Sequence, residues 1–115
     1  MDSNTKACIA FVVASHQGAR KNSVYDHSQG KYIQITGAVT SNEANIYDHD
    51  RGCHFSGSIS NLYDYGRSAH VSLNMNLNQF NGFDYGDGHH YSGTINGSSV
   101  SIYDHGLGEY FSYTL

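Results

Sequence analysis

The stretch YDHDRGCHF, residues 47–55, decides the fold of this chain, because close copies of it recur along the sequence. Its first three residues have four counterparts within 115 residues. The five copies begin with Tyr25-Asp26-His27, Tyr47-Asp48-His49, Tyr63-Asp64-Tyr65, Phe83-Asp84-Tyr85 and Tyr103-Asp104-His105. Self-similarity at a spacing of about 20 residues indicates one small structural unit that is used repeatedly.

The columns of the repeat predict how its residues pair. We number each copy from its leading aromatic residue, which is position 0. Positions 0 and +7 hold aromatic or histidine side chains, whereas position +8 is apolar in every copy and position −1 is apolar in four. A four-residue loop after position +1 would place −1 opposite +8 and 0 opposite +7, and opposed residues of an antiparallel pair share one face. Each copy therefore predicts a β-hairpin, with Ile46 opposite Phe55 and Tyr47 opposite His54.

The loop residues agree with this hairpin. Position +1 is aspartate in all five copies, and a carboxylate there can accept backbone N–H groups two or three residues further on. Position +5 is glycine in four copies and Ser68 in the third. A four-residue hairpin loop often closes with a residue of positive φ, where glycine meets no steric penalty. The repeated aspartate is thus explained as a turn former, without any ligand.

The hairpins predict the fold class and a single domain over residues 1–115. Apolar and polar residues alternate along segments such as Phe55–Ile59 and Phe111–Leu115, which is typical of half-buried antiparallel strands. The apolar run 7–14 is rich in β-branched residues and predicts a buried N-terminal strand; as a signal-peptide core it would lack a basic start. We expect an all-β antiparallel β-sandwich of about five sequential hairpins plus this strand. The alternative is a closed barrel or a β-prism-like arrangement.

Composition bears on partners and on redox state. The net charge is −4, and no lysine or arginine follows Arg67. A nucleic-acid surface needs clustered basic residues, so we expect no nucleic-acid partner. No stretch approaches the roughly 20 apolar residues that span a bilayer, so we expect no membrane span. The two cysteines, Cys8 and Cys53, are too few for a disulfide scaffold, and we expect free thiols. Compartment and oligomeric state are left open.

Histidine and aspartate in the loops raise the question of a metal site. The candidate ligands are His49 and His54, which flank one loop, and Asp87 and His89, which lie in another. Tyrosine, however, replaces histidine at positions +2 and +7 within this same chain. A metal ligand tolerates that exchange poorly and a packed ring tolerates it well, so we expect no metal and no cofactor.

The aromatic face of the hairpins is the stronger candidate for binding. If this face is solvated, its rings form a surface of the kind that stacks sugars or contacts a protein partner, because tyrosine combines an apolar body with a hydrogen-bonding tip. If it packs on a second sheet, it is core, which is the commoner fate of such a face. The candidate ligand-binding residues are Tyr47, His49, Arg51, His54, Tyr65, Tyr85, His89 and His105.

The sequence favours a protein that is not an enzyme. It contains no nucleophile elbow, phosphate loop or zinc-protease motif, and a residue pattern that recurs in every copy is unlike a unique active site. We therefore expect a small non-enzymatic recognition module of unknown physiological role, which binds a glycan or a protein partner through its repeated loops. The alternatives are a metal-binding protein, or a structural protein that self-associates through its strand edges.

Overall fold

The computed structural model describes residues 1–115 and contains one helix followed by eleven strands. The helix, α1, spans Ser3–His16. The strands are β1 (Ser23–Asp26), β2 (Lys31–Val39), β3 (Glu43–Asp48), β4 (Cys53–Ser58), β5 (Asn61–Asp64), β6 (Ala69–Ser72), β7 (Asn74–Asn76), β8 (Gln79–Asp84), β9 (His89–Asn96), β10 (Ser99–Asp104) and β11 (Glu109–Thr114).

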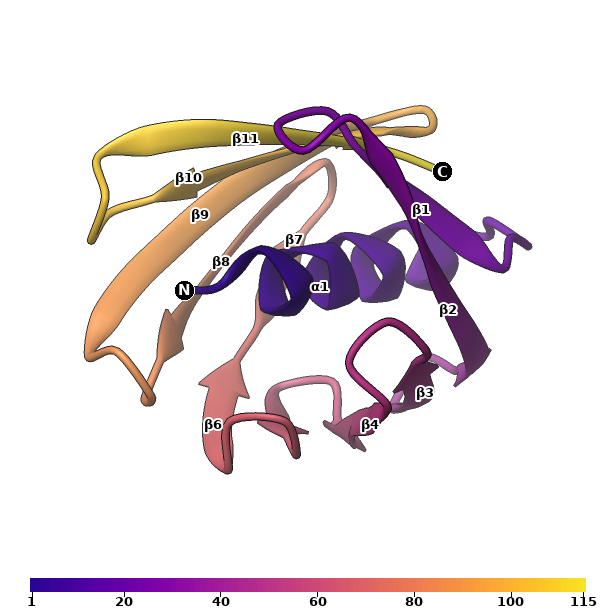
Figure 1. Cartoon of the computed structure of the whole chain (residues 1–115), viewed down its shortest axis with the longest axis horizontal. Helices are drawn as coiled ribbons and strands as arrows, with labels where there is room; N and C mark the ends of the chain where they lie inside the picture. The colour runs from indigo at the N-terminus through magenta and orange to yellow at the C-terminus, as the bar shows by residue number, and fades with distance from the viewer.

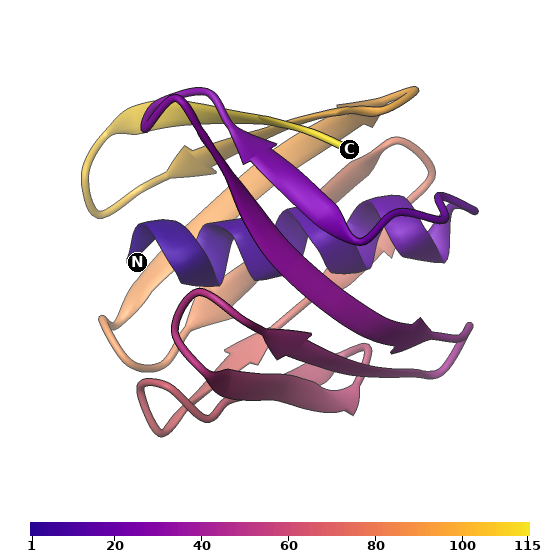
Figure 2. The ribbon, with the colours of Figure 1, turned by 45° about the vertical axis from the view of Figure 1, so that its right-hand side comes forward.

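The strands form a closed antiparallel barrel that surrounds the helix (Figures 1 and 2). The sheet runs β6-β5-β4-β3-β2-β1-β11-β10-β9-β8-β7, and a pairing of β6 with β8 closes ten of these strands into a ring with β7 as an extra strand. The all-β class is confirmed, but the preferred sandwich is wrong and the alternative barrel is the observed form. A ten-stranded barrel is too wide for its own side chains to fill, and α1 occupies that space.

The N-terminal segment corrects a second expectation, because residues 7–14 belong to α1 and not to a strand. Asp2 caps the helix by accepting a hydrogen bond from the Thr5 backbone N–H at 2.7 Å. Every residue from Thr5 to Ala14 is buried, so the helix has no polar face and shows no helical period in sequence. A helix that is apolar all round is typical of a fully enclosed position. No helix in the structure is long and apolar enough to cross a lipid bilayer.

The hairpin register of the sequence is confirmed in all five copies. In the second copy, Ile46 lies opposite Phe55, Tyr47 opposite His54 and Asp48 opposite Cys53. The same three pairings recur in the other hairpins. The closing glycines have φ between 64° and 73°, and Ser68 adopts φ 53° at the equivalent position. The turn therefore demands the left-handed conformation even where glycine is absent.

The barrel wall has two weak seams. β1 meets β11 through only two residue pairs, Tyr25 opposite Thr114 and Asp26 opposite Tyr113. β6 meets β8 through the single pair of Val71 with Asp84. Most other neighbouring strands pair over four to six residues. Interactions other than sheet hydrogen bonds must therefore help to hold the two shells, β1–β6 and β8–β11, together.

Both thiols are free, as expected. Cys8 is buried on α1 and Cys53 is half-buried at the start of β4. Burial raises the pKa of the Cys8 thiol well above its ordinary value, with the nearby Asp48 carboxylate adding to the effect. Cys8 is thus a neutral packing residue in the barrel interior.

Removing a large helix side chain tests whether α1 forms the core. Phe11 is 2% exposed, so we expect Phe11→Ala to lower the free energy of unfolding by about 3–5 kcal/mol. Urea unfolding followed by circular dichroism measures this change. The matched control is Leu107→Ala, which removes a side chain that is 59% exposed and is expected to alter stability by less than about 0.5 kcal/mol. Equal stability of the two variants would contradict the enclosed helix.

Candidate functional site

The two faces of each hairpin lie on opposite sides of the barrel wall. Positions −1 and +1 point inward, so Ile46 and Asp48 are both buried. Positions 0, +2 and +7 point outward, which leaves Tyr47 half-buried and His49 and His54 exposed. The strand alternation thus separates an acidic set of side chains inside the barrel from an aromatic set outside it.

The five repeated aspartates form a buried ring near the N-terminal end of α1. Each is at most 1% exposed. One carboxylate oxygen of each caps its own loop: Asp48 Oδ1 accepts from the backbone N–H groups of Asp50 and Arg51, at 2.9 and 3.1 Å. The other four aspartates accept at least the first of these two bonds in their own loops. The predicted turn-forming role of the aspartates is confirmed.

The second carboxylate oxygen of three aspartates binds arginine, and these arginines link neighbouring hairpins. Arg51 Nε donates to Asp48 at 2.7 Å, and its Nη1 lies 3.1 Å from Asp64. Arg67 Nε donates to the same Asp64 at 3.0 Å, and its two terminal nitrogens donate to both oxygens of Asp84 at 2.9 and 2.8 Å. Because Asp64 ends β5 and Asp84 ends β8, Arg67 spans the β6–β8 seam.

The helix supplies the remaining partners of the ring. The Met1 ammonium group binds Asp87 and Asp104, and Lys6 Nζ lies 3.6 Å from Asp104 and 3.2 Å from the centre of the Phe111 ring. Burial lowers the pKa of Lys6, and attraction to Asp104 opposes this only in part. The positive end of the helix dipole faces the same carboxylates. Four of the five ring aspartates, Asp48, Asp64, Asp84 and Asp104, are therefore paired with cationic groups of the protein itself.

The first aspartate of the series differs from the others. Oδ2 of Asp26 is buried and has no hydrogen-bond partner within the protein. Position +4 is arginine in the second and third copies, but it is Gln29 in the first. A hairpin is therefore linked to its neighbour by an arginine only where position +4, three residues after the aspartate, is arginine.

The outward positions of each hairpin form an aromatic triad, defined as the side chains at positions 0, +2 and +7. In the second copy the Tyr47 ring lies 4.8 Å from both His49 and His54, centre to centre, and meets each ring edge-on. All five triads keep these separations within 4.7–4.9 Å. Edge-to-face contacts of this kind are favourable, so each triad holds its rings in a fixed arrangement.

The aromatic face is solvated and does not form core, which answers the question that the sequence left open. The central rings of the triads are half-buried, while the rings at +2 and +7 are exposed. Four tyrosines in these outer positions are between 57% and 74% exposed: Tyr32, Tyr65, Tyr85 and Tyr110. This amount of exposed aromatic surface, repeated around one end of the barrel, is the most distinctive feature of the exterior.

The histidines at position +2 hydrogen-bond to hydroxyl groups of the preceding hairpin. His49 Nε2 lies 2.7 Å from Thr36 Oγ1, and His105 Nε2 lies 3.2 Å from Ser92 Oγ. His27 makes the same kind of contact with Thr114, at 2.7 Å, across the β1–β11 seam. These contacts fix the outer rings relative to the neighbouring strands.

The predicted site residues are distributed and do not form one cluster. The structure brings only three of them together in one triad, and Tyr65, Tyr85 and His105 belong to three other triads. The predicted ligand-binding residue Arg51 lies in the carboxylate ring and is 17% exposed. Asp87 and His89 line a hollow at the barrel mouth beside Met1.

The weak metal candidates do not converge either. His49 and His54 both pack against the same tyrosine ring. No group of three or more histidine, cysteine, aspartate or glutamate side chains lies close enough to hold a metal ion. The structure therefore offers rings and hydroxyl groups on its exterior, and ion pairs in its interior.

No protein-family model, curated protein or solved structure matches this chain. Its function must therefore be inferred from its own geometry.

Removing one arginine tests the carboxylate ring. We expect Arg67→Gln to lower the free energy of unfolding by about 3–5 kcal/mol, because Asp84 is then left as a buried charge without its partner. The matched control is Lys31→Gln, which breaks the exposed Lys31–Asp50 pair and should change stability by less than about 1 kcal/mol. Guanidinium unfolding curves give both values. Similar losses in the two variants would contradict a stabilising ring.

The ring also predicts that acid destabilises the protein. Burial disfavours the charged form of Asp64, but hydrogen bonds from Thr5, Arg67 and Arg51 outweigh it and hold the pKa of Asp64 below its ordinary value. A carboxyl with a lowered pKa in the folded state contributes stability above its unfolded pKa, about 3.9, and loses it as pH falls through the folded pKa. We expect the free energy of unfolding to be constant from about pH 7 to pH 5 and to fall below about pH 4. Urea unfolding at each pH measures it, and stability that rises below pH 4 would contradict the ring.

Proposed function

We propose that this protein is a small non-enzymatic recognition module that binds a glycan through its aromatic triads. The observation that supports the proposal is the outward orientation of all five triads, four of which hold an outer tyrosine in solvent. A tyrosine ring offers an apolar face for a sugar ring and a hydroxyl group that can hydrogen-bond to it. Rings of this kind, held on a rigid barrel wall, are suited to binding a ligand without catalysing a reaction.

The rigidity of the triads supports binding in particular. Each central ring is held by two ring contacts, and Tyr25 is an example, at 4.9 Å from His27 and 4.8 Å from Tyr32. Side chains that are already ordered lose less conformational entropy when a ligand binds. The triads therefore present a preformed surface.

The placement of charge supports the same proposal. Four of the repeated aspartates, all except Asp26, form ion pairs with Lys6, Arg51 or Arg67 near one end of the barrel interior. Both arginines of the repeat, Arg51 and Arg67, are thereby held inside the barrel mouth and are not presented on the outer face of the hairpins. The repeated hairpins place aromatic rings on the surface, while their aspartates are buried and stabilise the turns.

Five similar triads also favour a ligand that repeats. A glycan with several copies of one unit could contact more than one triad, and each further contact would then be intramolecular and add to the total affinity. Self-association through strand edges is less well supported, because every strand except the three-residue β7 is paired on both sides.

Truncation of the exposed rings tests the proposal. We expect the variant with Tyr32→Ala, Tyr65→Ala, Tyr85→Ala and Tyr110→Ala to bind glycans at least about tenfold more weakly than the native protein, since each lost ring contact is worth about 1 kcal/mol. A glycan array followed by titration calorimetry on the best ligand measures this. The variant also loses four ring contacts within the triads, so its melting temperature should fall, and its circular dichroism spectrum at the titration temperature should still match that of the native protein.

The matched control for this experiment is Leu107→Ala, which removes an exposed apolar side chain from the loop of the fifth hairpin. It should bind as the native protein does. An array on which the native protein binds no glycan would overturn the proposal, and so would a quadruple variant that binds as tightly as the control.

A further inference from the structure

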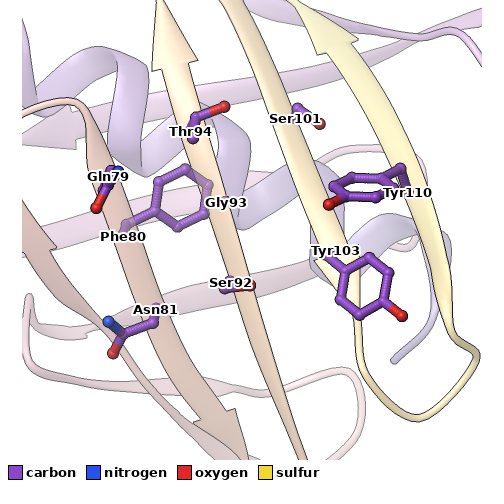
Figure 3. A pocket seen from close by; sticks show the side chains of 9 residues that line it. All are labelled: Gln79, Phe80, Asn81, Ser92, Gly93, Thr94, Ser101, Tyr103 and Tyr110. Carbon is purple, nitrogen blue, oxygen red and sulfur yellow. The ribbon is translucent and has the colours of Figure 1, made fainter.

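Two adjoining hollows, of about 280 and 480 Å³, lie on the outer wall formed by β8, β9, β10 and β11. Figure 3 shows the residues that line the smaller one. The two hollows share Thr94 and Ser101, which lie on neighbouring strands. We refer to them together as the side-wall groove. It begins at the triad of the fifth hairpin and extends away from the loops toward the β1–β11 seam.

The strand register explains why the groove runs across the strands. One row of outward side chains joins Gln79, Thr94, Ser101 and Ser112 through direct cross-strand pairs. A second row, nearer the loops, joins Asn81, Ser92, Tyr103 and Tyr110 in the same way. The first row holds the short side chains of two serines and a threonine, whereas the second ends in two large rings. Short side chains therefore form the floor of the groove, and the rings of Tyr103 and Tyr110 border it on the side of the hairpin loops.

The groove is uncharged, because its lining contains no aspartate, glutamate, lysine or arginine. It presents hydroxyl and amide groups, with His27 at its far end. The side chains of Gln79, Asn81, Thr94 and Ser101 are absent from the hydrogen-bond network of the protein and are free to bind a ligand. Figure 3 shows Tyr103 and Tyr110 on one side of the hollow and Gln79 and Asn81 on the other.

The opposite wall of the barrel differs from this one. The corresponding outward row on β2 to β5 joins Ala38, Asn45, Ser56 and Tyr63. An alanine at one end and a triad ring at the other leave fewer free hydroxyl and amide groups there. The repeat therefore supplies triads on both walls. A second uncharged hollow lies beside His70 and Tyr85, but fewer residues line it than line either half of the side-wall groove.

We infer that the side-wall groove binds a linear, electrically neutral oligosaccharide that lies across β8 to β11 with one end against Tyr103 and Tyr110. This inference rests on the proposed function and names its ligand class. An uncharged groove favours a neutral ligand, because an anionic glycan would need lysine or arginine partners. Hydroxyl and amide groups in a row match the donors and acceptors that a sugar chain presents along its length.

A peptide fits the groove less well than a sugar chain. An extended peptide usually adds to an unpaired strand edge, and β8 to β11 are each paired on both sides. Peptide binding also depends on apolar anchor pockets, which this hydroxyl-lined row does not provide. Strands lie about 4.8 Å apart, so the four-strand row extends about 14 Å and accommodates a few sugar units.

Filling the groove tests the inference. We expect Ser101→Tyr to weaken binding of a neutral oligosaccharide at least about tenfold, because the new ring occupies the middle of the row. The matched control is Ser56→Tyr, the same exchange at a half-buried outward position of the opposite wall, and it should bind normally. The probes are linear oligosaccharides of glucose, xylose, mannose and N-acetylglucosamine, with two to six units, titrated by calorimetry.

Salt provides a second measurement. Affinity for the neutral probe should change less than about twofold between about 50 and 500 mM sodium chloride, since no charged pair is formed. Both tyrosine variants should keep the native melting temperature, because strands accept tyrosine well at outward positions.

The outcomes separate this inference from the proposed function. If Ser101→Tyr binds normally while the quadruple ring variant does not, the groove is not the site and the proposed function stands. If only anionic glycans bind, or if affinity falls steeply with salt, the neutral ligand class is wrong. If no glycan binds, both proposals fail.

Discussion

The buried ion-pair ring at the mouth of the barrel is the constraint on which the rest of the structure depends. The sheet alone closes poorly, because one seam has two residue pairs and the other has one. Arg67 joins carboxylates on the two sides of the β6–β8 seam, and Lys6 lies between the aspartates of β1 and β10, which flank the β1–β11 seam. Lys6 reaches its aspartates because α1 lies inside the barrel, whereas Arg67 reaches its aspartates from a hairpin loop. The enclosed helix, the closed wall and the repeated aspartate therefore meet in one ion-pair ring.

The same arrangement determines what the exterior can do. Strand alternation sends the aspartate of each copy inward and its aromatic neighbours outward. Since the ring takes up most of the strongly interacting charges, the outer wall retains rings, hydroxyl groups and amides. Variation between the copies then gives the exterior its asymmetry, and the polar row beside Tyr103 and Tyr110 has no equal on the wall that carries Tyr47.

The sequence predicted the local structure well and the non-local structure poorly. The hairpin register emerged because its partners are only five to nine residues apart, and columns of like residues report such pairings directly. The closure of the barrel needs β1 to pair with β11, which come from the first and last copies, and no column of the repeat indicates that pairing. Residues 7–14 were taken for a strand because a helix that is apolar on every side has no period to detect.

The sequence predicted the aromatic part of the site but not its ionic part. The aromatic rings were identified, but whether they faced solvent or a second sheet depended on closure. The ion-pair ring was missed because turn formation already accounted for one oxygen of each aspartate. Its signal was arginine at position +4 in two copies, within reach of the aspartate three residues earlier.

The repeat divides each hairpin into an inner half that carries the ring aspartate and an outer half that, we propose, binds the ligand. Backbone amide NMR spectra, recorded while a neutral oligosaccharide is added, distinguish the two halves. We expect shifts confined to outward residues of β8 to β11, including Ser92, Thr94, Ser101 and Tyr103, with the signals of α1 unmoved. Shifts centred on the ring aspartates and Arg67, or on no outward residue of the wall, would contradict this expectation.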